Sequence, residues 1–174
     1  MTNIAASVSL LAAMGATHIL VPNLPDLGKT PSSIGAGPAT VAGAHALSIA
    51  FNTGLAGALS SLSTLFPRDI VPFDTFALFD QVLADAAHQG FSNTTQACLA
   101  GSSADATSTL TAACAAAGPD HYVFWDDIHP TTHTQALLGQ AFSAALDVPE
   151  PSEFALLGLG VLAFAAARRV KRRR

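Results

Sequence analysis

The chain has 174 residues, half of them hydrophobic, and a formal net charge of −4. This length fits one domain with a sizeable core. The charge is unevenly distributed, because residues 1–150 contain two basic and eleven acidic side chains, whereas residues 151–174 contain six basic and one acidic. An acidic body repels phosphates, so nucleic acid is excluded as its partner.

Helical and strand-like segments alternate in the first part of the chain. Residues 1–14 are expected to form a helix that Gly15 ends, and the apolar residues 17–22 suit a buried parallel strand. Residues 23–37 are rich in Pro and Gly and are expected to be a loop at the carboxyl end of that strand, where open α/β sheets place their sites. Asn23 and Asp26 in this loop either shape a pocket or form turn hydrogen bonds, and the second interpretation is favoured.

Two more helices and a strand are expected before residue 90. Residues 39–65 have helical spacing with one apolar face, formed by Leu47, Phe51, Leu55, Leu59 and Leu62. Residues 68–73 are short and β-branched, as in a strand. Residues 74–88 predict a helix with Asp74 as N-cap and a buried face made of Phe76, Phe79, Val82 and Leu83.

Two cysteines, Cys98 and Cys114, flank a segment rich in Ser, Ala and Thr. A zinc site would need more ligands at tighter spacing, so we do not expect one. In an oxidising compartment the two thiols could close a disulfide loop, which on the chain-entropy model contributes about 3 kcal/mol. Two buried free thiols are the alternative, and the compartment decides between them.

The segment Phe124-Trp125-Asp126-Asp127-Ile128-His129-Pro130-Thr131 places a carboxylate three residues before a histidine. Pro130 suits the first turn of a helix over residues 131–146, so His129 lies at a loop-to-helix junction. Asp126 can accept a hydrogen bond from one imidazole nitrogen and leave the other free to take a proton from a hydroxyl nucleophile. Phe124 and Trp125 would wall the pair off from bulk water. For an isolated Asp-x-x-His, mere helix capping is the favoured alternative, but the surrounding block reverses that preference.

This segment, together with Gly15-Ala16-Thr17-His18-Ile19-Leu20-Val21-Pro22-Asn23-Leu24-Pro25-Asp26-Leu27-Gly28, resembles the C-terminal half of GDSL-type (SGNH) esterases and lipases. The resemblance implies a three-layer, flavodoxin-like α/β fold with a parallel sheet, truncated at its N-terminal side. It assigns Asp126 and His129 to the acid and base of a Ser-His-Asp triad. The family's nucleophilic serine and oxyanion-hole residues precede the Pro-Asn-Leu-Pro-Asp segment, so they are expected upstream of this chain.

The last 27 residues contain Pro149-Glu150-Pro151, an apolar run over residues 154–167 and a basic end over residues 168–174. Fourteen apolar residues are fewer than the roughly 20 of a comfortable bilayer crossing, although terminal arginines can snorkel. The pattern resembles a PEP-CTERM sorting signal. It implies a partner protease of the exosortase type, transient insertion of residues 154–167 as a hydrophobic helix in the inner membrane, and delivery to the surface of a Gram-negative bacterium. A domain over residues 1–147 would then precede a sorting segment over residues 148–174.

The combined prediction is an exported serine ester hydrolase that needs no metal or organic cofactor. Its substrate would be a lipid, a short acyl ester or an acylated polysaccharide. The first residues lack the basic region of a signal peptide, so Met1 is expected to be internal or a truncated start, and the chain as given an inactive fragment. A non-catalytic, surface-anchored remnant and an acyltransferase with the same Asp-His pair are the alternatives.

Overall fold

The computed structural model describes residues 2–66, 70–101 and 107–146. The expected sorting segment at residues 148–174, with its hydrophobic helix, lies outside the described residues. The helices are α1 (Thr2–Ala13), α2 (Pro31–Gly35), α3 (Pro38–Leu65), α4 (Thr75–Ala84), α5 (Ala112–Ala117) and α6 (Thr132–Ala145), with 3-10 turns η1 (Leu27–Lys29) and η2 (Pro119–His121). The strands are β1 (Ile19–Pro22), β2 (Ile70–Phe73), β3 (Asn93–Ala97), β4 (Leu99–Ala100), β5 (Thr109–Leu110) and β6 (Tyr122–Phe124).

Parallel strands pair in two places. β1 pairs with β2 in continuous register from Ile19 opposite Ile70, and β3 pairs with β6 with an irregularity between its two ends. β4 and β5 form a short antiparallel pair. The predicted α/β class with parallel strands is therefore confirmed. The one continuous sheet that was expected is not seen in the described ranges, where the strands form separate pairs of two.

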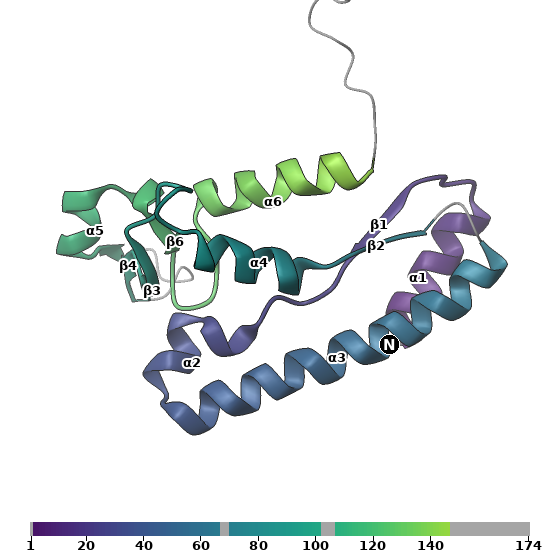
Figure 1. The fold of residues 1–174 in the computed structure, drawn as a ribbon, viewed down its shortest axis with the longest axis horizontal. Coiled ribbons are helices and arrows are strands. Elements are labelled where there is room, and N and C mark those ends of the chain that lie inside the picture. The colour runs from purple at the N-terminus through teal and green to yellow at the C-terminus, as the bar shows by residue number, and fades with distance from the viewer. Residues whose placement is uncertain (1, 67–69, 102–106, 147–174) are drawn as a thin grey trace, which may run out of the picture.

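Helices lie on both sides of the strands. In Figure 1, α3 runs along one side of the molecule and α6 along the other, with β1, β2 and α4 between them. α1, β1 and α3 share one core cluster, made of Val8, Ala12, Ile19, Val21, Leu55, Leu59 and Leu62. A second cluster joins α4 to β6 and consists of Phe79, Val82, Phe91, Val123 and Phe124.

The expected helices in the first half are all present, with small differences in their buried faces. Asp74 caps α4 as predicted, because its carboxylate accepts the N–H of Ala77 at 3.1 Å. Leu47 was assigned to the buried face of α3, but its side chain is 70% exposed. Phe76 and Leu83 were expected to be buried on α4 and are only half-buried.

The segment over residues 23–37 is not all loop, as it was expected to be. It contains η1 and α2, because two side chains cap these short turns: Asp26 accepts the N–H of Gly28 at 2.9 Å, and Thr30 accepts that of Ser33 at 3.3 Å. Local side-chain caps of this kind make one-turn helices possible in a Pro- and Gly-rich sequence. The turn chemistry favoured for Asp26 is therefore present.

The structure joins Cys98 and Cys114 in a disulfide, with their Cα atoms 5.1 Å apart. Both residues are fully buried, and they pack with Tyr122 and the half-buried Trp125. The bridge therefore ties the β3–β4 region to α5 beside β6. Of the two alternatives that the sequence left open, the structure contains the oxidised one.

Candidate active site

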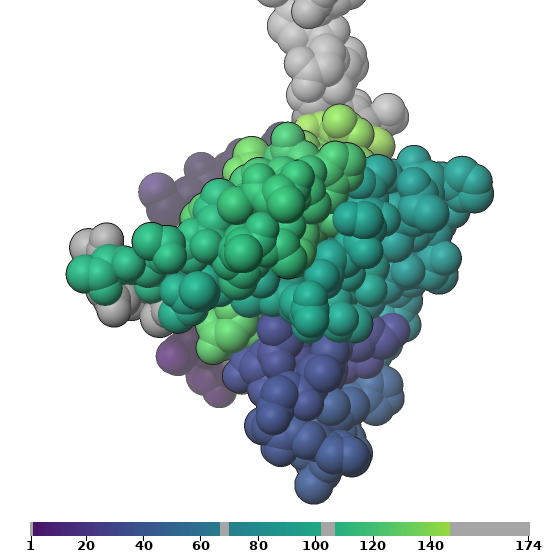
Figure 2. All heavy atoms as spheres, turned by 90° about the vertical axis from the view of Figure 1, so that its left-hand side faces the viewer, coloured from purple at the N-terminus to yellow at the C-terminus, as the bar shows by residue number. Residues whose placement is uncertain are grey.

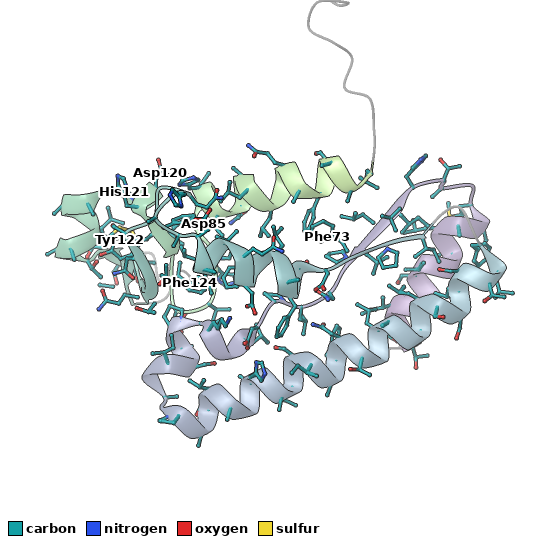
Figure 3. The ribbon with its side chains drawn as sticks, viewed as in Figure 1. Phe73, Asp85, Asp120, His121, Tyr122 and Phe124 are labelled. Carbon is teal, nitrogen blue, oxygen red and sulfur yellow. A yellow bond between two sulfur atoms is a disulfide. The ribbon has the colours of Figure 1, made fainter. Side chains whose placement is uncertain are left out.

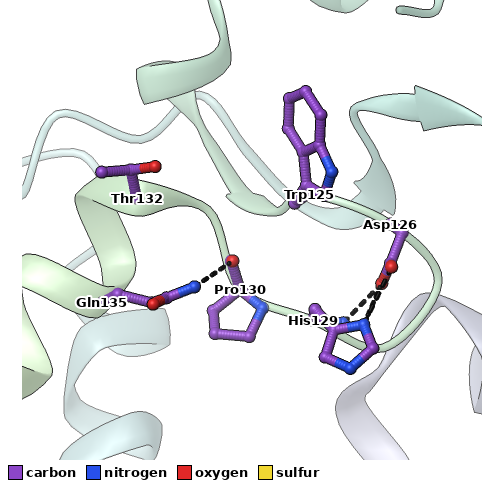
Figure 4. A pocket seen from close by; sticks show the side chains of 6 residues that line it. All are labelled: Trp125, Asp126, His129, Pro130, Thr132 and Gln135. Atoms are coloured by element: carbon purple, nitrogen blue, oxygen red, sulfur yellow. Dashed lines mark hydrogen bonds and ion pairs between the residues drawn. The ribbon is translucent and has the colours of Figure 1, made fainter. Parts of the chain in front are cut away.

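Asp126 and His129 lie in the loop between β6 and α6. The carboxylate of Asp126 is 1% exposed, and its Oδ2 lies 2.8 Å from Nδ1 of His129 (Figure 4). Its Oδ1 accepts the backbone N–H groups of Ile128 at 2.9 Å and His129 at 2.6 Å. One buried carboxylate thus fixes both the shape of the turn and the direction of the imidazole.

The partner of the imidazole determines which of its nitrogens carries the proton. A carboxylate only accepts hydrogen bonds, so Nδ1 of His129 must donate. In the neutral ring the lone pair is then on Nε2, which is the arrangement of a general base that acts on a hydroxyl. The side chain of His129 is 66% exposed, so this nitrogen is accessible in the part of the protein that the structure describes.

A cavity of about 420 Å³ lies beside this pair, lined by Trp125, Asp126, His129, Pro130, Thr132 and Gln135 (Figure 4). The pair is not walled off from water as expected, because the side chain of His129 is 66% exposed in the described part of the chain. Trp125 nevertheless contributes to the site. Phe124 does not, because successive side chains of a strand point to opposite faces. Its ring is buried and packs edge-to-face on that of Phe79, with the ring centroids 5.8 Å apart. Figure 3 labels Phe124 on β6.

Backbone hydrogen bonds hold both ends of the loop. The N–H of Trp125 donates to the carbonyl of His129 at 2.8 Å, which closes the loop on itself. On the far side, the hydroxyl of Thr131 donates to the carbonyl of Tyr122 at 2.7 Å, and its N–H donates to that of Val123 at 2.9 Å. Thr131 therefore connects the start of α6 to β6 by hydrogen bonds and fixes the position of the loop between them.

The helix after the site begins later than predicted. Thr131 is the N-cap of α6, and Pro130 lies before the helix, in an isolated bridge with Phe124. Sequence reasoning missed the role of Thr131, although threonine is among the preferred N-cap residues. His129 is not the cap, so the helix-capping alternative does not account for it.

The loop also contacts the segment after β1. The N–H of Ser32 in α2 donates to the carbonyl of Asp127 at 2.9 Å. Figure 2 shows the blue-violet atoms around α2 directly below the green and teal body that contains α5 and β6. The helix α2, which follows the segment at residues 15–28, therefore contacts the loop that carries Asp126 and His129.

His133 lies one turn after the site and contacts other parts of the protein. Its side chain is half-buried, Nδ1 donates to the carbonyl of Asp120 at 2.8 Å, and its ring stacks 4.7 Å from that of Phe91. Neighbouring His121 donates from Nδ1 to the carbonyl of Gly90 at 2.8 Å. Figure 3 places Asp120 and His121 together at this end of the molecule. Both histidines thus stabilise neighbouring backbone segments through hydrogen bonds to carbonyl groups.

A second Asp–His pair was missed by sequence reasoning. Asp26 is buried, and its Oδ2 lies 2.7 Å from Nδ1 of His45 on α3. The two residues are 19 positions apart and belong to different elements, so no local spacing signals their contact. Asn23 from the same loop instead bonds Asp74 at 2.9 Å and the N–H of Phe76 at 2.9 Å.

Residues 2–142 match the model of the GDSL-like Lipase/Acylhydrolase family. The chain belongs to this family. Residues 147–173 match the PEP-CTERM protein-sorting motif, which supports export and surface sorting. Both predicted resemblances are thereby confirmed, and the family implies an α/β fold.

A curated relative, the thermolabile hemolysin of Vibrio parahaemolyticus, is 39% identical to the chain over 77 residues. The match covers 41% of this chain and 18% of that protein, so the chain spans less than a fifth of its GDSL-family relative. Among the described helices, none has the length and apolar character of a membrane span. The run over residues 154–167 lies outside the ranges that the structure describes.

Proposed function

We propose that this GDSL-family chain carries the acid and base of an exported serine ester hydrolase, with His129 as general base and Asp126 as the residue that orients it. The observation that supports this most strongly is the hydrogen bond of 2.8 Å between the buried carboxylate of Asp126 and Nδ1 of the exposed His129. It leaves Nε2 as the proton acceptor beside a cavity of about 420 Å³.

The reaction would run in two proton-balanced halves. Nε2 of His129 takes the proton of a serine hydroxyl as its oxygen attacks the ester carbonyl carbon, and Asp126 stabilises the imidazolium. His129 then gives this proton to the leaving alkoxide oxygen, so an alcohol departs and an acyl-serine remains. Water repeats the cycle, releasing the acid and restoring the serine.

The proposed nucleophilic serine is not among the residues that the structure describes at this site. In the family's order the serine and the oxyanion donors come before the segment at residues 15–28, so we assign them to sequence that precedes residue 1. The completed domain would be a three-layer, flavodoxin-like α/β unit ending at about residue 147. Its substrate would be a lipid, a short acyl ester or an acylated polysaccharide.

The sorting segment would act after export. We assign recognition by an exosortase-type protease to Pro149-Glu150-Pro151 and transient insertion in the inner membrane to residues 154–167. The match of residues 147–173 to the sorting motif supports this assignment. The product would be an esterase on the surface of a Gram-negative bacterium.

Hydrolysis of p-nitrophenyl butyrate tests the proposal. The 174-residue chain should show no enzyme-like turnover, whereas a version extended by the genomic sequence upstream of residue 1 should be active. His129→Gln in the extended version should lower kcat by about 10⁴-fold or more. His133→Gln is the matched control, because this histidine braces the backbone without contacting Asp126.

Each other outcome has a definite meaning. A folded but inactive extended protein would support the non-catalytic remnant and overturn the hydrolase. Ester formation with an added alcohol, faster than release of the free acid, would favour the acyltransferase. Turnover by the 174-residue chain that depends on His129 would show that the nucleophile is one of its own serines.

A further inference from the structure

The Asp26–His45 pair opens onto a groove of its own. The groove has a volume of about 530 Å³ and shares no lining residue with the cavity at His129. Its walls contain Asp26, Lys29 and His45, and four apolar residues from the end of α2 and the first turns of α3: Ile34, Pro38, Val41 and Ala42. The proposed esterase mechanism uses none of these residues.

The carboxylate of Asp26 is held rigidly at this groove. It is 4% exposed and its Oδ1 accepts the N–H of Gly28 at 2.9 Å. Gly28 packs directly against α3, because a Cβ there would lie 2.6 Å from the carbonyl oxygen of Val41 and 3.2 Å from Cβ of His45. The loop therefore approaches the helix closely enough for Asp26 to reach the imidazole.

The hydrogen-bonding state of His45 follows from its partner. Since a carboxylate accepts but does not donate, the contact of 2.7 Å requires the proton on Nδ1. In the neutral ring, Nε2 is then an acceptor and is the nitrogen left to bond a ligand. The side chain of His45 is 47% exposed and lines the groove. A hydrogen-bond acceptor among apolar walls selects a ligand with a hydroxyl donor on an apolar body.

The charges of the groove disfavour an anion. Lys29 lines it, but Nζ of Lys29 lies 2.6 Å from a carboxylate oxygen of Asp80, so its charge is already balanced. Asp26 adds a second carboxylate beside the imidazole. When His45 is neutral, Lys29, Asp80, Asp26 and His45 together carry no net positive charge. A carboxylate or phosphate ligand therefore gains little in this groove.

We propose that the Asp26–His45 pair and its groove bind the hydroxyl group of an apolar alcohol, with Nε2 of His45 as the acceptor. The apolar part of the ligand lies along Ile34, Pro38, Val41 and Ala42. This site is independent of the proposed esterase, so each can fail without the other.

Three eight-carbon probes distinguish the possible ligands: 1-octanol, 2-octanone and octanoate. Their dissociation constants are measured by titration of the protein at pH 8, with the His45 ring signals followed by NMR. Octanol should bind about fivefold more tightly than octanone, the fold-change of one hydrogen bond, and more tightly than octanoate. Equal binding of octanol and octanone, or tightest binding of octanoate, would overturn the proposal.

Two variants separate the hydrogen bond from the apolar contacts. His45→Leu should keep octanone binding and abolish the preference for octanol, because the acceptor is gone while the apolar surface remains. Asp26→Asn should also remove the preference, since an amide N–H facing Nδ1 moves the ring proton to Nε2. His88→Gln is the control: His88 also contacts an aspartate, but it is 87% exposed and outside the groove.

Asp26 is buried, so circular dichroism is recorded for every variant and shows whether Asp26→Asn unfolds the loop. If it does, the decision rests on His45→Leu alone, which replaces a half-exposed ring by a smaller apolar side chain and leaves Asp26 unchanged. An unchanged preference for octanol in a folded His45→Leu variant would refute the site.

Discussion

The two carboxylate oxygens of Asp126 contact His129 in different ways. Oδ1 accepts the backbone N–H of His129 at 2.6 Å, and Oδ2 lies 2.8 Å from Nδ1 of the same residue. The side chain that orients the imidazole also shapes the turn that carries it. Both functions come from one side chain that acts within residues 126–129.

Asp126→Asn should therefore disturb the orientation and tautomer of the His129 imidazole while leaving the fold of the turn intact. An asparagine oxygen can still accept both backbone N–H groups, but its amide favours the wrong imidazole tautomer. In an active, extended form of the protein we expect kcat to fall by up to about 10⁴-fold, with little change in melting temperature. Asp127→Asn is the matched control, because Asp127 contributes its carbonyl, which Ser32 contacts, and not its carboxylate. Equal losses of kcat at both positions would refute the assignment.

The disulfide should contribute measurably to stability. Cys98 and Cys114 are 16 positions apart, and a loop of this size is worth about 3 kcal/mol on the chain-entropy model. Urea unfolding under oxidising and reducing conditions should show that loss on reduction of the wild type. A Cys98→Ala, Cys114→Ala double variant should be insensitive to the reductant. Mass spectrometry of unreduced peptides from exported protein should recover the bridged pair, and two free thiols there would contradict it.

Thr75 offers a stabilising substitution. Its Oγ1 is buried and has no hydrogen-bond partner among the described residues, and the side chain lines a small cavity of about 60 Å³ next to Phe79 and Phe124. An unpaired buried hydroxyl costs free energy, so Thr75→Val should raise the free energy of unfolding by about 1 kcal/mol. Thr75→Ala should lower it instead, because it enlarges the cavity. Destabilisation by Val, measured in urea, would mean that the hydroxyl bonds a buried water.

The pKa of His88 should be raised above 6.5, first by its hydrogen bond to Asp85 and then by the charge of that carboxylate. A raised pKa in the folded state means that the pair stabilises the protein at pH values below the unfolded pKa. This stabilisation is lost as the pH rises through the folded pKa. NMR titration of the His88 ring should show the shift, and Asp85→Asn should abolish it. Because both side chains are exposed, the effect on stability should be small.

The sorting segment can be tested apart from the enzyme. A secreted reporter fused to residues 148–174 should be processed and retained at the surface in a host that has the sorting protease. Replacing Pro149-Glu150-Pro151 by alanines should block processing while membrane insertion persists, since residues 154–167 are unchanged. Equal processing of both reporters would contradict the sorting assignment and would mean that residues 148–174 act only as a hydrophobic anchor.

The sequence by itself determined the features that depend on neighbours along the chain. Asp126 reaches His129 across three residues, Asp74 caps the helix that it precedes, and the periodicity of residues 39–65 produces α3. Local geometry fixes such contacts, so composition and spacing were enough to predict them.

Only the tertiary structure decided the contacts between elements. Asp26 meets His45 because the loop at Gly28 packs against α3, and Ser32 meets Asp127 because α2 lies beside the β6–α6 loop. The exposure of Leu47 was decided in the same way. Residues 19 or more positions apart are brought together by packing, and no local spacing encodes which of them will touch.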